Sequence, residues 1–381
     1  MRSIPIDDKI KGFAADYMKD VGIAVPDAKE KLEGLARFLG LHTTEIYEHK
    51  AKKLKIIPSN GQYFSKISEY VETIADRYGE INDMLPSQCS ELITHMEGIL
   101  GKYKVEDIWV KKRRETWDRN EGRDRRAPLW ELIVKAMGYH EVRKEVFPNY
   151  VKKLDIKSCV YCNAQFTVTT LIEEVHDRVK KGTRGRPKEA RVIPLMGGYY
   201  EVDHNKPKSK YPYLCTNFYN LQPCCSSCNK RKSDHNISFS LYREGEFDGE
   251  ESLHFVIPHQ AIIDFHTQGK CKGVVAHLCD EGSMDAVEPD SDGTLAARFN
   301  HYFDIDKLYA ELDDEVEELL WRNRIYTKGL VDATNTQYSQ LGIKDFDFER
   351  YILGTYVNKD EVFKRPLTKM KQDIWEQLKG E

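Results

Sequence analysis

The sequence has no long hydrophobic run. Nowhere in its 381 residues is there a stretch close to the roughly 18 consecutive apolar residues that a membrane-spanning helix needs. The opening segment, MRSIPIDDKIKGFAADY, places Asp7 and Asp8 where a signal peptide would have its apolar core. We therefore expect a cytoplasmic protein with no membrane partner.

The protein also lacks a strong net charge. A value of −4 argues by itself against a protein that coats nucleic acid. The charge is nonetheless uneven, because residues 151–240 hold 16 Lys and Arg against 8 Asp and Glu, whereas residues 241–381 hold 16 against 29. This asymmetry favours contact between the basic centre and a polyanion, and local solvation without any partner is the alternative.

The nine cysteines cannot all pair as disulfides, because their number is odd. Cys89, Cys271 and Cys279 stand alone and are expected to be small buried hydrophobic residues. The others cluster, and C-x-x-C pairs in a cytosolic protein indicate metal ligands rather than disulfides. Two such pairs suit structural Zn²⁺, because each supplies two thiolates and the ion joins segments about 60 residues apart. Cys224 adjoins Cys225 but lacks this spacing. The expected zinc ligands are Cys159, Cys162, Cys225 and Cys228.

Apolar periodicity and turn residues predict an α+β protein with three regions. The regions are a helical N-terminal region (1–150), a central module (151–240) with a basic insertion (176–198), and an acidic, mostly helical C-terminal region (241–381). Helices are expected at 28–41, 67–78, 307–330 and 366–379, and a helix–turn–helix over 129–156 with its turn at Pro148. Strands are expected at 165–175, 199–204 and 252–258.

The central module also carries residues suited to hydrolysis. Asp203 and His204 are adjacent on an expected strand, and four cysteines already complete a zinc site without them. A histidine can take a proton from water, and a neighbouring carboxylate suits a hard divalent cation. Asn229 follows the last cysteine directly, opens an expected helix, and offers the same cation an oxygen ligand.

The motifs CVYC (159–162), YYEVDH (199–204), YNLQP (219–223) and CSSCNKRK (225–232) resemble those of HNH endonucleases with the ββα-metal fold. The resemblance implies that His204 is the general base and that Asn220 orients the histidine loop. It implies that Asp203 and Asn229 bind the catalytic Mg²⁺ or Mn²⁺, beside structural Zn²⁺. Asn229 stands at the third position of the family name, which favours a hard ion. The implied reaction hydrolyses DNA and leaves 5′-phosphate and 3′-hydroxyl ends.

Basic residues near these motifs are expected to hold phosphates without reading the base sequence. They are Lys206, Lys208, Lys210, Lys230, Arg231 and Lys232. The alternative for any one of them is that it only solubilises a loop. In the insertion, Arg184 and Arg186 lie in RGRP, which resembles the core of an AT-hook that enters the minor groove. The charged run 102–126 is either a solvated face or a further nucleic-acid contact.

The wider block DHNKPKSKYPYLCTNFYNLQPCCSSCNKRKSD, with YILGTY (351–356) and KRPLTKMKQDIWEQL (364–378), is similar to the HNH component of Septu-type anti-phage defence systems. That resemblance implies an ABC-type ATPase partner. Because one HNH site cuts one strand at a time, double-strand cleavage would need a second copy or a second event, which leaves a homodimer open. Two other functions remain open: a zinc-stapled DNA-binding or scaffold protein without catalysis, and an HNH nuclease acting on RNA.

Overall fold

A computed structural model describes residues 1–50, 52–111, 126–175, 192–245, 253–280, 293–343 and 347–380. These residues mix helices with short strands, so the predicted α+β class is confirmed. Every helix among them is too short or too polar to cross a membrane. Residues 176–191 of the predicted insertion, with Arg184 and Arg186, lie outside the described residues, as does 112–125 of the charged run.

The N-terminal region is a set of helices packed beside a four-stranded sheet. Its elements are β1 (Ile4–Pro5), α1 (Asp8–Ala24), α2 (Ala28–Leu39), β2 (Ile46–Lys50), β3 (Lys53–Ile56), α3 (Phe64–Ile81), α4 (Pro86–Leu100), η1 (Val105–Asp107), β4 (Ile108–Lys111) and β5 (Arg126–Pro128). The helices α2 and α3 confirm the predicted periodicity, since they pack on each other along their apolar faces. The wholly helical interpretation of residues 1–100 is wrong at β2 and β3. All of β3 is exposed, so it has no buried face whose alternation would predict a strand.

The central part of the protein has a helical run, a long hairpin and a short one. Its elements are α5 (Leu129–Ala136), α6 (Tyr139–Glu141), the π-helical turn η2 (Val142–Val146), α7 (Phe147–Lys153), β6 (Thr169–Val175), β7 (Val192–Gly198), β8 (Glu201–His204), η3 (Pro212–Leu214), η4 (Phe218–Asn220), β9 (Leu221–Cys224), α8 (Ser226–Lys232) and β10 (Tyr242–Arg243). The turn predicted at Pro148 is wrong, because a proline in the first turn of α7 has no intrahelical N–H bond to lose. The backbone turns instead at Gly138, whose φ is +70°.

The C-terminal region joins a two-stranded sheet to a series of helices. Its elements are β11 (Leu253–Val256), α9 (His259–Gln268), β12 (His277–Asp280), α10 (Leu295–Phe303), α11 (Ile305–Ala310), α12 (Asp313–Ile325), α13 (Lys328–Gln340), α14 (Phe348–Leu353), η5 (Lys359–Lys364) and α15 (Thr368–Gly380). The strand predicted at 252–258 and the last helix are confirmed. The helix predicted over 307–330 is instead divided among α11, α12 and α13.

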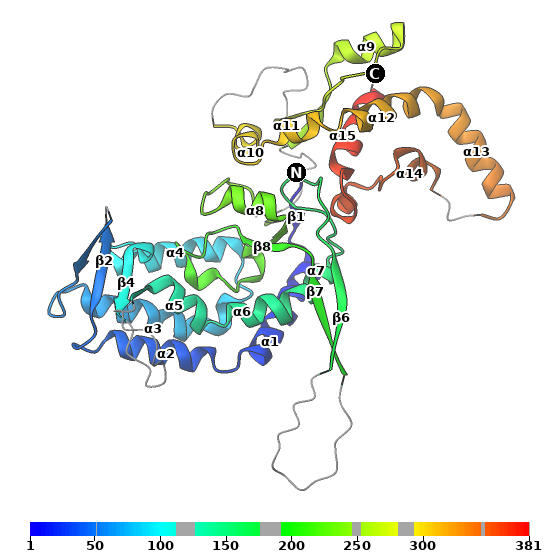
Figure 1. Ribbon diagram of the computed structural model, residues 1–381. Helices are drawn as coiled ribbons and strands as arrows, with labels where there is room; N and C mark the ends of the chain where they lie inside the picture. Colours follow the sequence, from blue (N-terminus) through cyan, green and yellow to red (C-terminus); the bar gives the residue numbers. More distant parts are fainter. Residues whose placement is uncertain are drawn as a thin grey trace, which may run out of the picture.

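The central part lies between the other two regions. Figure 1 shows β8 and α8 above the N-terminal helices and below α10 and α11, with the β6–β7 ribbon projecting away from this body. Two buried tyrosines tie the regions together: the Tyr17 hydroxyl donates to the Thr216 carbonyl (2.8 Å), and the Tyr309 hydroxyl donates to the Cys162 carbonyl (2.7 Å). The parallel pairing of β1 with β10 adds a backbone connection. One hydrophobic core therefore runs through all three regions.

Candidate active site

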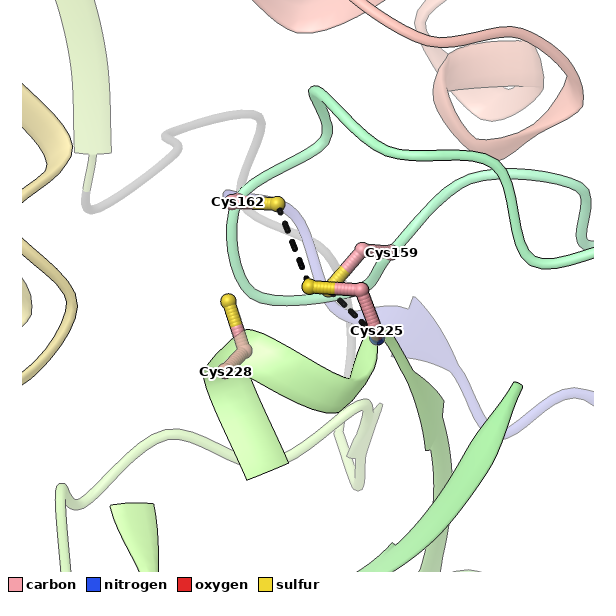
Figure 2. Close-up of side chains that lie close together, drawn as sticks. All are labelled: Cys159, Cys162, Cys225 and Cys228. Atoms are coloured by element: carbon pink, nitrogen blue, oxygen red, sulfur yellow. Dashed lines mark hydrogen bonds between the residues drawn. The ribbon is translucent and has the colours of Figure 1, made fainter. Parts of the chain in front are cut away.

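The four predicted zinc ligands come together. The sulfur atoms of Cys159, Cys162, Cys225 and Cys228 all lie within 4.8 Å of one another (Figure 2). The sulfurs of Cys162 and Cys225 are 4.0 Å apart, too far for a disulfide. Zn–S bonds of about 2.3 Å in a tetrahedron place sulfurs roughly 3.8 Å apart. The cluster can therefore hold a metal ion such as zinc with little movement.

Local backbone structure explains how each pair presents its sulfurs. The first pair lies in a tight turn, in which the Asn163 N–H donates to the Cys159 carbonyl (2.8 Å) and Asn163 adopts a φ of +51°. Cys225 is the N-cap of α8, and Cys228 lies in the first turn of that helix. The Cys225 N–H donates to the Cys159 sulfur (3.3 Å), which joins the two pairs directly.

Hydrogen bonds within the cluster favour a thiolate at one position. Those from the Cys159, Cys162 and Cys228 thiols lower the pKa of Cys225. A thiolate is the form of cysteine that binds a metal. Cys224 does not belong to the cluster, because its thiol is buried and lies 3.7 Å from the Glu201 carbonyl. The choice of Cys225 over Cys224 from the C-x-x-C spacing is thus confirmed.

His204 ends strand β8, which pairs with β9 in an antiparallel hairpin. Its side chain is buried, and its Nε2 lies 3.1 Å from the Cys215 carbonyl oxygen. A carbonyl oxygen only accepts hydrogen bonds, so Nε2 must carry the proton and Nδ1 keeps its lone pair. Burial first, and then the positive charge of Lys208, lower the pKa of His204 to about 3. The imidazole is therefore neutral at physiological pH.

Asn220 fastens the loop that follows His204. Its Oδ1 accepts from the Lys206 N–H (2.6 Å), and its Nδ2 donates to the carbonyls of Leu214 (2.9 Å) and Lys206 (3.2 Å). The Asn220 backbone carbonyl also accepts from the Asn205 N–H (2.9 Å). These bonds connect both ends of the loop to the buried Asn220.

The Asp203 carboxylate is already paired. The Tyr161 hydroxyl donates to its Oδ2, and the Lys232 ammonium lies 2.9 Å from Oδ2 and 3.2 Å from Oδ1. Lys232 also donates to the His204 carbonyl (2.8 Å) and is completely buried. Lys232, which the sequence predicts to hold a flanking phosphate, is therefore buried against Asp203 in this structure. Its position on α8 turns it inward, toward the β8–β9 hairpin.

Several of the predicted residues line one cleft of about 360 Å³. Its lining includes Asp203, His204 and Asn229, together with Trp130 and Lys208. The expectation that Asn229 opens a helix is wrong, because α8 begins three residues earlier, at Ser226. The side-chain amide of Asn229 therefore belongs to the first turn of α8 and not to its start. Carboxylate and amide oxygens are hard donors of the kind that Mg²⁺ and Mn²⁺ take as ligands. In this structure the Asp203 carboxylate holds the Lys232 ammonium.

The remaining basic residues predicted to bind phosphate differ in whether they line the cleft and whether they are ion-paired. Lys208 and the exposed Lys230 line the cleft, and the Lys208 ammonium lies 4.8 Å from the centre of the Tyr139 ring. The Lys206 side chain is half-exposed. Lys210 is 3.7 Å from Asp234, and Arg231 forms an ion pair with Asp304. Lys208 and Lys230 are thus the best placed for a phosphate in the cleft.

Sequence reasoning missed the residues that support this cleft. Tyr139 packs on the His204 ring at 4.9 Å between centroids, Tyr161 binds Asp203, and Trp130 forms part of the lining. Only Tyr161 carried a signal, since it lies inside the first C-x-x-C pair. A larger cleft of about 890 Å³, between α3 and α4, includes Arg77 and His95 and contains none of the predicted residues.

Comparisons with protein-family models, with curated proteins and with solved structures find no match for this protein.

Proposed function

We propose that this protein is a metal-dependent HNH endonuclease that hydrolyses phosphodiester bonds in DNA. The observation that carries the proposal is the cleft in which a neutral histidine meets two oxygen donors and two lysines. His204 lies there with Asp203, Asn229, Lys208 and Lys230. Beside it, the cysteine cluster fixes the start of α8, the helix that carries Asn229.

His204 would act as the general base. Its Nδ1 lone pair accepts a proton from a water molecule, and the water oxygen forms a bond to phosphorus. The bond from phosphorus to the 3′-oxygen then breaks, and this oxygen takes up a proton from solvent. The products are a 5′-phosphate and a 3′-hydroxyl. The hydrogen bond from Nε2 to the Cys215 carbonyl stabilises the imidazolium formed during this step.

Other residues of the cleft would bind and orient the substrate. Asp203 and Asn229 would hold Mg²⁺ or Mn²⁺, which when bound polarises a phosphate oxygen and stabilises the departing 3′-oxygen. Lys208 and Lys230 would hold the phosphates on either side without reading bases. Asn220 would keep the loop that carries Lys208 in place through its three side-chain hydrogen bonds.

A substitution of His204 separates this function from its alternatives. His204→Ala should keep its affinity for a DNA duplex and lose cleavage by at least about 100-fold, the typical contribution of a general base. A zinc-stapled binding or scaffold protein would show no cleavage with either form. Cleavage of RNA in preference to duplex DNA, in a competition between the two, would assign the same site to an RNA nuclease.

The similarity to the HNH component of Septu systems extends the proposal to anti-phage defence, with an ABC-type ATPase as partner. Co-purification of the full-length protein with such an ATPase, and a change in cleavage when ATP is added, would support this role. Double-strand cleavage by a single site would involve a homodimer or two successive events.

A further inference from the structure

The pair formed by Lys232 and Asp203 is the most deeply buried ion pair of the cleft. The side chain of Lys232 is 0% exposed and that of Asp203 is 6% exposed. Taking both charges out of water costs free energy, which their attraction offsets only with good geometry and further hydrogen bonds. Both conditions are met, because the Lys232 ammonium also donates to the His204 carbonyl and Tyr161 donates to Asp203.

This pair leaves a divalent cation with no free carboxylate among the described residues that line the cleft. Two aspartates line it: Asp203 is bound to Lys232, and Asp234 lies 3.7 Å from Lys210. Lys208 and Lys230 add two positive charges to the same lining. A cation that enters alone is therefore repelled, whereas an anionic phosphate is attracted.

We propose that Lys232 is a built-in counter-ion of Asp203, which a divalent cation must displace, and that the cation enters the cleft together with a phosphate. The inference rests on the proposed function, since it concerns the same metal site. The phosphate supplies the negative charge that the cleft lacks and gives the displaced ammonium a new partner. Lys232 is thus a positioning residue that couples metal binding to nucleic-acid binding.

The test measures Mn²⁺ affinity rather than activity. Zinc-loaded full-length protein is titrated with Mn²⁺, and free Mn²⁺ is followed by electron paramagnetic resonance, with and without a DNA duplex carrying phosphorothioate linkages. Lys232→Met and Lys232→Gln remove the charge, and the second keeps a hydrogen-bond donor. Lys19→Met is the control, because it removes an exposed lysine that lies outside the cleft.

Without DNA, both Lys232 variants should bind Mn²⁺ at least about tenfold more tightly than the wild type, since one unit charge in direct contact changes ionic binding by that factor or more. Lys19→Met should stay within about twofold, because its charge is screened by solvent and lies outside the cleft. With the duplex present, the wild-type protein should bind Mn²⁺ more tightly than without it. The increase should exceed the Mn²⁺ binding of the duplex alone.

Equal Mn²⁺ affinity in the wild type and both Lys232 variants would overturn the inference and leave the proposed nuclease intact. If no form of the protein binds Mn²⁺, with or without the duplex, both the metal site and the proposed function are contradicted. Thermal melting keeps the test decisive if the Lys232 variants lose stability. Mn²⁺ should then raise their melting temperature more than that of the wild type, and an equal rise would contradict the inference.

Discussion

At the scale of residues, the candidate site depends on hydrogen bonds that fix the position of its functional side chains. His204 has its tautomer set by the Cys215 carbonyl, and its loop is fastened by Asn220. The sequence motifs singled out Asp203, His204 and Asn229, which line one cleft, and the resemblance to HNH endonucleases added Asn220. The Lys232–Asp203 contact could not, because a basic residue in a basic run gives no sign of turning inward.

Asn220→Ala tests the fastening of the histidine loop. Removing the amide leaves the Lys206 N–H and the Leu214 carbonyl without their partner, which should lower the free energy of unfolding by about 3 kcal/mol. Cleavage should fall more than DNA binding, because the loop carries Lys208 and follows the proposed base. Urea denaturation and duplex binding are the measurements. The control is Asn236→Ala, an exposed position where about 0.5 kcal/mol or less is expected, and equal losses at both positions would contradict this role.

At the scale of elements, one tight turn and the seven-residue helix α8 come together through their cysteines. The sequence predicted this join well, because C-x-x-C spacing is imposed by local ligand geometry. It failed where tertiary packing decides the outcome. The exposed strand β3 has no alternation to detect, and Pro148 marks the start of α7 rather than a turn because the backbone bends earlier, at Gly138.

Cys159→Ser tests the cysteine cluster. Loss of one ligand should abolish stoichiometric zinc and lower the free energy of unfolding by about 3 kcal/mol or more, since zinc links folding of α8 to the first turn. Zinc content by atomic absorption and the melting temperature are the readouts. Cys271→Ser is the control, because this buried cysteine lies outside the cluster and its variant should keep its zinc. A Cys159→Ser protein with full zinc and unchanged melting would refute the assignment.

At the scale of the whole molecule, elements of the central part and of the C-terminal region meet around the cleft and the cysteine cluster. Trp130 comes from α5, Asp203 and His204 from β8, and Asn229 from α8. The C-terminal region reaches the cluster through Tyr309. The Tyr309–Cys162 contact joins residues 147 positions apart, and no local pattern in a single sequence predicts it. The α+β class and the cysteine cluster could be predicted from the sequence, whereas this arrangement could not.

Tyr309→Phe tests the connection between the C-terminal region and the first cysteine pair. Losing the hydroxyl removes its hydrogen bond to the Cys162 carbonyl and should lower the free energy of unfolding by about 1 kcal/mol, while zinc content stays the same. Chemical denaturation measures the change. Tyr199→Phe, at an exposed tyrosine, is the control and should have a smaller effect. A Tyr309→Phe protein as stable as the wild type would show that this bond contributes no net stability.

The most direct test of the central claim is cleavage of supercoiled plasmid by the purified zinc-loaded protein with Mg²⁺ or Mn²⁺. His204→Ala and EDTA are the controls. Nicked or linear plasmid that requires both His204 and the divalent ion is the expected result. An intact plasmid in every lane, from protein that is folded and binds DNA, would contradict a nuclease acting on its own and favour the binding or scaffold function.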